Sequence, residues 1–213
     1  MIEFFKKVVN LFIPEDRKIE KLLKLSQSEL RNALQRTEPI KEKDTFPIFD
    51  YRNKNTSSLI WALKYRRHPE ILWRIAKFLY EEIMELGEER LLFEGKSEMA
   101  LIPIPIGSRS RRERGFNQTE ELAKAISKVS NGEIKILNIL EKIKETRNQT
   151  RLSREDRLQN MLETMKTKDF FLSKDILPIL LDDVYTTGAT IKEARRALAL
   201  AGIKDVLAVK IAH

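Results

Sequence analysis

Short apolar segments alternate with helix-like segments along the later part of this chain, and this alternation limits the fold class. The apolar segments are MALIPIPI at 99–106, IKILNIL at 134–140, ILPILL at 176–181 and VLAVKIA at 206–212. Helical spacing of apolar residues occurs between them, at about 117–129, 154–164 and 189–201. A strand that is apolar throughout must be covered on both faces, as in a parallel sheet. The sequence therefore predicts an α/β fold with a doubly wound parallel sheet flanked by helices.

The beginning of the chain has a different pattern. Apolar residues share one helical face over 2–12, and the residues at 26–29 are spaced as a capping box for a further short helix. Residues 37–48 lose the helical period and contain two prolines, which predicts a linker. We therefore expect a helical N-terminal extension at 1–45 and an α/β domain at 46–213. The apolar face of the first segment must be covered, by this domain, by a second subunit in a homodimer or, as the least favoured alternative, by a membrane surface.

Composition excludes several kinds of site. The chain has no cysteine and only two histidines, His68 and His213, so disulfides, thiolate zinc sites and His-based metal or Ser–His–Asp centres are not expected. No apolar run approaches the roughly 20 residues of a membrane span, so we expect a cytoplasmic protein without membrane insertion.

The charge of the chain is concentrated in one region. A formal net charge of +8 fits either the Lys- and Glu-rich surface of a heat-adapted protein or a surface that faces an anion. Residues 101–150 hold ten basic and six acidic side chains, whereas residues 1–50 hold ten and nine. This distribution favours a local anion site.

One segment combines an apolar strand with groups that suit a phosphorylated sugar. It reads ILLDDVYTTGAT and runs from Ile179 to Thr190. Ligands of open α/β sheets bind outside the carboxyl ends of strands, and a Thr/Gly loop at a helix N-terminus offers backbone N–H groups to a phosphate. Asp182 and Asp183 would repel this phosphate unless they hold vicinal hydroxyls or a hydrated metal ion. A phosphorylated ribose meets both demands, and the structural alternative is a plain strand end with a Thr cap.

The segment resembles the 5-phosphoribosyl 1-diphosphate (PRPP) motif of type I phosphoribosyltransferases. The resemblance implies that Asp182 and Asp183 are catalytic, bind the ribose hydroxyls and contact Mg²⁺. It also implies that the following loop wraps the 5-phosphate, through Tyr185, Thr186, Thr187, Gly188, Ala189 and Thr190.

Further segments narrow the resemblance to the ComF group of competence-associated, phosphoribosyltransferase-like proteins. They are the IPIPI strand at 102–106, R-G-F-N-Q at 114–118, and a series of spaced residues made up of Thr146, Gln149, Leu152, Arg157 and Asn160. The resemblance covers roughly residues 50–213. It implies a type I phosphoribosyltransferase-like fold and a link to DNA uptake. Members of the group commonly begin with a cysteine zinc module, which a chain without cysteine cannot form. No zinc is therefore expected.

The basic segment after the first apolar strand suits the diphosphate of PRPP. Backbone amides of Gly107 and Ser108, backed by a catalytic Arg109 and by Arg114, can neutralise a leaving group with several negative charges. The remaining arginines at 111–112 are expected to point outward. The alternatives for this cluster are a solvated face and a nucleic-acid patch.

The segment 141–152 is polar and basic between a predicted strand and a predicted helix. This pattern suits a flexible flap over the ligand, with Arg147 and Gln149 as candidate residues, or an ordinary exposed loop.

The leading hypothesis is a PRPP-binding, Mg²⁺-dependent phosphoribosyltransferase that releases diphosphate and uses an unidentified acceptor. Residues 51–66 are expected to roof the acceptor pocket, with Tyr51, Trp61, Lys64 and Tyr65 as candidates, although burial in the core is the commoner use of such aromatics. The alternative is a non-catalytic DNA-uptake protein that binds single-stranded DNA or a partner helicase. PRPP would then be a regulatory or vestigial ligand.

Overall fold

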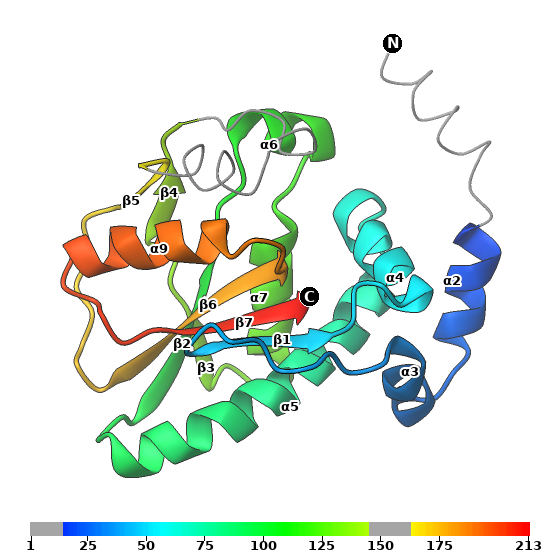
Figure 1. Cartoon of the computed structure of the whole chain (residues 1–213), viewed down its shortest axis with the longest axis horizontal. Coiled ribbons are helices and arrows are strands. Elements are labelled where there is room, and N and C mark those ends of the chain that lie inside the picture. Colours follow the sequence, from blue (N-terminus) through cyan, green and yellow to red (C-terminus); the bar gives the residue numbers. More distant parts are fainter. Residues whose placement is uncertain (1–14, 145–162) are drawn as a thin grey trace.

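The computed structural model describes residues 15–144 and 163–213. Its centre is a five-stranded sheet in the order β1-β7-β6-β2-β3, and all neighbouring strands are parallel (Figure 1). The strands are β1 (Thr45–Phe49), β2 (Glu98–Pro103), β3 (Ile134–Ile136), β6 (Ile176–Val184) and β7 (Leu207–Ala212). The predicted α/β fold, a phosphoribosyltransferase-like parallel sheet flanked by helices, is confirmed.

Helices cover both faces of this sheet. Helices α5 (Pro69–Phe93) and α7 (Gln118–Val129) lie on one face, and α9 (Ala189–Leu200) lies on the other (Figure 1). Consecutive residues of β6 serve the two sides, since Ile179 joins the core under α5 and α7 whereas Leu180 packs with α9. The strands are apolar throughout because both of their faces are buried.

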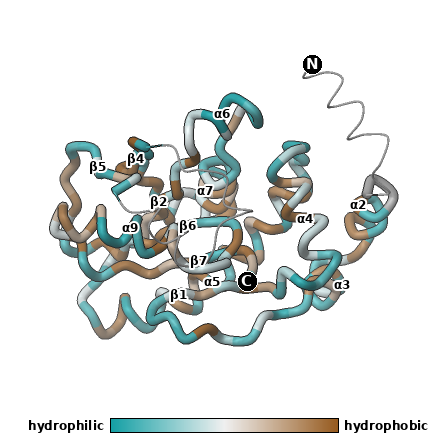
Figure 2. Tube along the Cα trace, turned by 45° about the horizontal axis from the view of Figure 1, so that its top comes forward, coloured by the Kyte–Doolittle hydropathy of each residue, from teal (hydrophilic) through white to brown (hydrophobic). Residues whose placement is uncertain are grey.

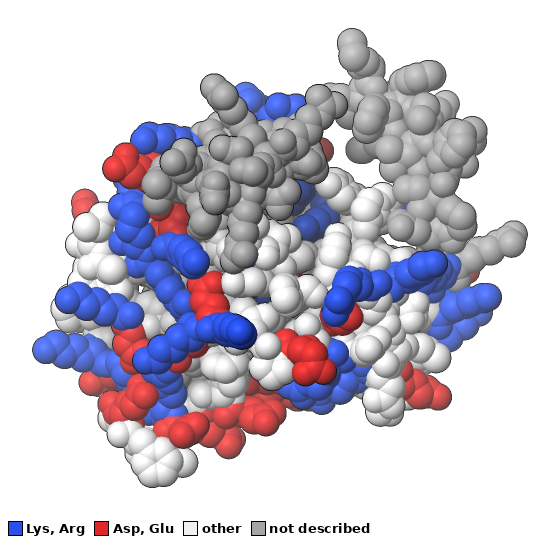
Figure 3. Space-filling view, viewed as in Figure 1, with Lys and Arg blue, Asp and Glu red and all other residues white. Residues whose placement is uncertain are grey.

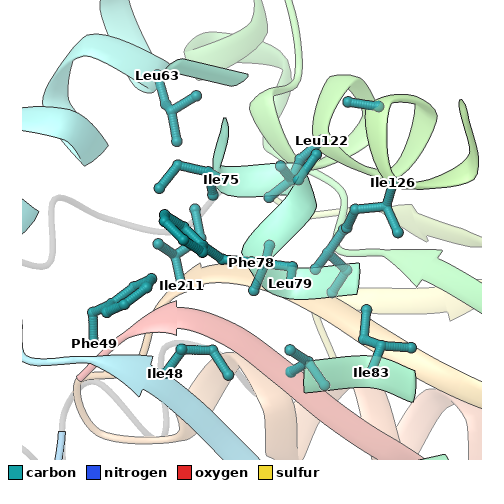
Figure 4. Packing of buried hydrophobic residues seen from close by; sticks show 14 of the residues in the cluster. Ile48, Phe49, Leu63, Ile75, Phe78, Leu79, Ile83, Leu122, Ile126 and Ile211 are labelled. Carbon is teal, nitrogen blue, oxygen red and sulfur yellow. The ribbon is translucent and has the colours of Figure 1, made fainter. Parts of the chain in front are cut away.

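The larger of the two cores lies between the sheet and α5. Phe78 of α5 meets Phe49 of β1 edge to face, with ring centroids 5.5 Å apart (Figure 4). Ile75, Leu79 and Ile83 on the same face of α5 are also buried. Hydrophobic stretches accordingly run through the centre of the molecule, while the outer helix α6 (Ser108–Arg114) is hydrophilic (Figure 2). Within the described residues, no helix has both the length and the apolar character that crossing a membrane requires.

The apolar segment 134–140 does not form one strand as predicted. β3 ends at Ile136, and Leu140 begins β4 (Leu140–Lys142), which pairs antiparallel with β5 (Met165–Thr167). Beyond the break, Ile139 and Leu140 are buried in the smaller core, together with α9. Arg147, Gln149 and nearly all of the helix predicted at 154–164 lie outside the described residues.

The N-terminal part of the described chain is helical, with α2 (Glu15–Leu23) and α3 (Gln27–Leu34) beside α4 (Lys54–Tyr65) (Figure 1). The predicted capping box is confirmed at Ser26 and Glu29. Four side chains of these helices are buried in the larger core, namely Ile19, Leu22, Leu30 and Leu34. Glu82 of α5 is buried and pairs with both Arg31 and Arg36, which holds this extension against α5. The apolar segment at 2–12 lies outside the described residues.

The prediction of a linker at 37–48 is wrong for its last four residues. Residues 45–48 belong to β1, an edge strand whose strand partner in the described sheet is β7, with one isolated antiparallel bridge between Phe49 and Arg36. Pro47 lacks an N–H group, and an edge strand tolerates this loss. The proline and the missing helical period therefore led to a loop prediction where a short strand occurs.

Candidate functional site

The carboxyl ends of β2 and β6 lie side by side at a change of direction in the sheet. β2 continues through α6 into α7 on one face, whereas β6 continues into α9 on the other. Neighbouring strands whose helices leave to opposite faces form a crevice outside their carboxyl ends, and open α/β sheets bind ligands there. The two loops that we predict to bind PRPP follow β2 and β6, and both begin at this crevice.

The two aspartates at the end of β6 have different partners because successive strand residues face opposite sides. Asp182 accepts a hydrogen bond from Lys210 Nζ at 2.7 Å. Asp183 accepts one from Gln118 Nε2 at 2.7 Å, and its Oδ2 lies 3.0 Å from Lys64 Nζ. Two lysines thus neutralise the two carboxylates.

Lys210 is the only charged residue in the apolar strand VLAVKIA, and sequence reasoning did not assign it a role. It is 1% exposed and stands opposite Asp182 in the register of β6 and β7. Its ammonium group also donates to the Val184 carbonyl at 2.9 Å. A lone lysine in a buried strand is a signal that could have pointed to a buried acidic partner.

Lys64 reaches the site from the last turn of α4. Burial by itself would lower the pKa of Lys64, but the charge and hydrogen bond of Asp183 outweigh it, so this pKa is raised. For Asp183, burial acts to raise the pKa, but the Lys64 ammonium group and the Gln118 hydrogen bond hold it below its usual value. Both groups therefore stay ionised at neutral pH.

The R-G-F-N-Q segment connects the β2 loop to Asp183. Gly115 ends α6 in the left-handed region with φ 79°, and Phe116 is buried. Asn117 caps α7 and donates to the Ile104 carbonyl at 3.1 Å, which ties this helix to the end of β2. Gln118 then accepts from Arg114 at 3.0 Å while it donates to Asp183. The sequence indicated Gln118 only as the last residue of the R-G-F-N-Q motif. The fold places its side chain between Arg114 and Asp183.

The segment predicted to hold the 5-phosphate, residues 185–190, consists of a loop at 185–188 and the first two residues of α9. Gly188 precedes this helix with φ 74°, a conformation that favours glycine. A Cβ atom at this position would lie 2.6 Å from Glu42 Oε2 and 2.8 Å from the Tyr185 hydroxyl. Tyr185 donates its hydroxyl hydrogen bond to Glu42. Glu42 thus lies against the loop, and nothing in the local sequence indicated that contact.

The arginines of α6 pair mainly with nearby acidic residues. Arg109 at the start of this helix is largely exposed, and its guanidinium lies 3.0 Å from Glu113 Oε1. Arg111 is exposed, as predicted, and pairs with Glu120 at 2.7 Å. Arg114 stacks over Tyr65 with 5.3 Å to the ring centroid. On the face seen in Figure 3, basic and acidic side chains are likewise interspersed.

No family model matches the chain. Curated proteins do match it. The Competence protein ComFC of Streptococcus pneumoniae is 33% identical over 161 residues, which are 75% of this chain. Competence protein F of Haemophilus influenzae is 28% identical over 170 residues, or 76% of this chain. These matches support membership of the chain in the ComF family.

A third ComF relative, the Competence protein ComFC of Bacillus subtilis, is 26% identical over 162 residues and 65% of this chain. The matches extend over 70% of the Haemophilus protein and 63% of each of the other two proteins. The ComF resemblance predicted from the PRPP-like motif and R-G-F-N-Q is therefore confirmed.

Two of the aromatic residues predicted near the acceptor pocket are more exposed than expected. Tyr51 is 42% exposed and Tyr65 is 55% exposed, so the interpretation of both as core side chains is wrong. Trp61 is partly buried and packs on Tyr65 with ring centroids 5.5 Å apart. Tyr65 is exposed because it is the last residue of α4, and Arg114 covers one face of its ring.

The side chains of the acidic pair are already supplied with hydrogen-bond donors. In the described ranges, no group of three or more His, Asp or Glu side chains gathers as metal ligands. The Oδ1 atoms of Asp182 and Asp183 accept the N–H groups of the next residues at 2.9 and 2.6 Å. The Oδ2 atoms accept from Lys210 and from Gln118. All four carboxylate oxygens already have donors, and the lysines balance their charge.

Proposed function

We propose that this protein binds magnesium-complexed PRPP at the crevice between β2 and β6 and transfers its phosphoribosyl group to an acceptor. The observation that carries the proposal is the meeting of two loops at one strand edge. One loop follows the acidic pair of β6, and the other follows β2 and reaches Asp183 through Gln118. We further propose that the activity serves DNA uptake, because the relatives are named competence proteins.

The lysine partners of the acidic pair support a sugar phosphate as the ligand. Two bare carboxylates would repel PRPP, whereas Lys64 and Lys210 remove this repulsion. Asp182 and Asp183 retain acceptor capacity, because each carboxylate oxygen can take more than one donor. Ribose 2- and 3-hydroxyls are donors that fit this capacity.

The two ends of PRPP would then contact different loops. Backbone N–H groups at the start of α9 and the threonines at 186–187 bind the 5-phosphate. Arg109 and Arg114 bind the diphosphate. Magnesium usually keeps several waters and binds through one or two carboxylates together with substrate phosphates, so it arrives here with PRPP as part of the substrate.

The reaction itself needs little covalent help from the protein. The C1–O bond to diphosphate breaks, and its electron pair leaves with the diphosphate. The acceptor nitrogen forms a bond to C1 and releases its proton to water. The contribution of the residues is to orient the ribose and to stabilise the charge that develops on the leaving group.

The proposal is tested by calorimetry with Mg–PRPP and with ribose 5-phosphate, on wild type, Arg109→Ala and Arg112→Ala. Arg112 is the matched control, since it lies on the same helix and its loss changes the net charge equally. Loss of a charge-assisted contact costs about 1.5–3 kcal/mol, so Arg109→Ala should weaken PRPP roughly 10- to 150-fold. Ribose 5-phosphate affinity should stay nearly unchanged, because this ligand lacks the diphosphate.

Two results would contradict this assignment. Absence of PRPP binding by the wild type would refute the proposed ligand. Equal weakening of both ligands in Arg109→Ala would remove Arg109 from the diphosphate site. PRPP binding without diphosphate release in the presence of any acceptor would favour the alternative, a non-catalytic DNA-uptake protein with PRPP as a regulatory ligand.

A further inference from the structure

The backbone just before β1 is held against α9 and the sheet. Arg195 of α9 donates hydrogen bonds to the Lys43 carbonyl at 3.1 Å and to the Asp44 carbonyl at 2.6 Å. The Ala208 N–H group of β7 donates to the same Asp44 carbonyl at 2.9 Å. These bonds place the next residue upstream, Glu42, beside the loop that leads into α9.

The carboxylate of Glu42 has a partner on the loop and another on the helix. Its Oε2 atom accepts the Tyr185 hydroxyl hydrogen bond at 2.5 Å. Its Oε1 atom lies 3.6 Å from the Arg195 guanidinium, and the Glu42 side chain is 16% exposed. Because Arg195 offsets the negative charge of Glu42, this carboxylate can lie near an anion site without strongly repelling a bound phosphate.

Tyr185 is the first residue of the loop at 185–188 and is held at several points. Its backbone N–H group donates to the Ala212 carbonyl at 2.7 Å. Its ring meets the His213 ring edge to face with 5.2 Å between centroids. Lys210, which also neutralises the acidic pair, lies with Nζ 5.4 Å from the same ring centroid. Tyr185 therefore connects the end of the sheet, through its hydroxyl, to Glu42.

The last residue of the same loop leaves room for the Glu42 carboxylate. Gly188 has φ 74°, and a Cβ atom there would lie 2.6 Å from Glu42 Oε2 and 2.8 Å from the Tyr185 hydroxyl. A side chain at position 188 would therefore displace one of these two groups. Glu42 thus lies against both the first and the last residue of the loop.

We infer that Glu42 is a positioning residue for the 5-phosphate site, and that it holds the 185–188 loop in its binding shape through Tyr185. This inference rests on the proposed function. It brings into the site a residue that precedes β1 and lies outside the predicted domain at 46–213. A loop that is ordered in advance binds its ligand more tightly, because the ligand does not have to supply the free energy of ordering. Loss of the Glu42 contact should therefore weaken every ligand that is held by its 5-phosphate.

The test uses the full chain and five variants, Glu42→Ala, Glu42→Gln, Tyr185→Phe, the double variant Glu42→Ala/Tyr185→Phe, and Glu38→Ala. Glu38→Ala is the matched control, since Glu38 is an exposed residue of the same segment and its loss changes the net charge equally. Calorimetry measures ribose 5-phosphate and Mg–PRPP with each protein. Circular dichroism at the titration temperature checks that each variant is folded.

We expect Glu42→Ala to weaken both ligands by the same factor, about three- to tenfold, because both carry the 5-phosphate. Arg109→Ala, in contrast, should weaken PRPP alone. Glu42→Gln keeps an oxygen that accepts the Tyr185 hydroxyl, so its affinities should stay within about twofold of wild type. Glu38→Ala should also stay within about twofold of wild type.

Tyr185→Phe removes the same hydrogen bond from the other side and keeps the ring, so it should match Glu42→Ala. The double variant should be no weaker than the weaker of the two single variants, because both substitutions delete one interaction. Should Glu42→Ala fail to fold, the comparison of Tyr185→Phe with wild type and Glu42→Gln decides.

The outcomes separate the two proposals. If wild type binds PRPP but Glu42→Ala binds both ligands as tightly as Glu38→Ala does, or more tightly, the positioning role is wrong and PRPP binding stands. The positioning role is equally wrong if Glu42→Gln is as weak as Glu42→Ala, or if the effects of Glu42→Ala and Tyr185→Phe add. If wild type does not bind PRPP, the proposed function fails and the role of Glu42 fails with it.

Discussion

Lys210→Met removes the cation that faces Asp182 and keeps a side chain of similar length. In the wild type the Lys210 side chain is 2% exposed and that of Asp182 is 11% exposed, with 2.7 Å between Nζ and Oδ2. The substitution leaves the Asp182 carboxylate with the Asp183 N–H group as its remaining donor. The Val184 carbonyl also loses the hydrogen bond from Lys210.

The expected loss of stability is large because the charge that remains is buried. Removal of one partner from a buried ion pair typically costs 3–5 kcal/mol, so we expect a loss of about this size. The double variant Asp182→Asn/Lys210→Met removes both charges, and its asparagine can still accept the Asp183 N–H. It should therefore recover about 2 kcal/mol or more of the loss, since replacing a whole buried pair is often near neutral.

Urea unfolding followed by circular dichroism measures these differences. The control is Lys135→Met, which breaks an exposed ion pair with Glu98 whose side chains are 53% and 42% exposed. This control should lose less than about 1 kcal/mol. The reasoning fails if Lys210→Met is no less stable than the control, or if the double variant is no more stable than Lys210→Met alone.

Two further predictions concern the same edge of the sheet. The pKa of Asp183 is lowered from 3.8, so its pairing with Lys64 stabilises the fold above about pH 4, and this contribution is lost as pH falls through the lowered pKa. The pKa of Lys64 is raised from 10.5, so the stabilisation by this pair is also lost as pH rises through the raised pKa of Lys64. The difference in unfolding free energy between wild type and Lys64→Met should therefore be largest near neutral pH. A difference that stays constant from pH 3 to pH 7 in urea unfolding would contradict this. Gly188→Ala should cost more stability than Gly95→Ala, because both glycines have positive φ but only at Gly188 would the new Cβ meet Glu42 and Tyr185. Equal unfolding midpoints for these two variants would show that the loop adjusts around the methyl group.

Features that depend on neighbouring residues could be predicted from the chain itself. Apolar strands, the capping box at Ser26 and the order of strand, acidic pair and Thr/Gly loop each occupy a few consecutive residues. Burial on both faces requires apolar residues at every strand position, so the parallel sheet could be inferred before any contact was known. The edge strand β1 was missed because its proline and short length give the local pattern of a loop.

Only the tertiary structure decided which residues meet at the site. Asp182 and Lys210 are 28 residues apart, Gln118 and Asp183 are 65 apart, and Tyr185 and Glu42 are 143 apart. These contacts follow from the strand order, which places β7 beside β6 and brings α4 and α7 to the same face. Local periodicity determines which residues are buried, but it carries no information on which buried residues become neighbours. The lysine partners of the acidic pair therefore depend on the fold as a whole.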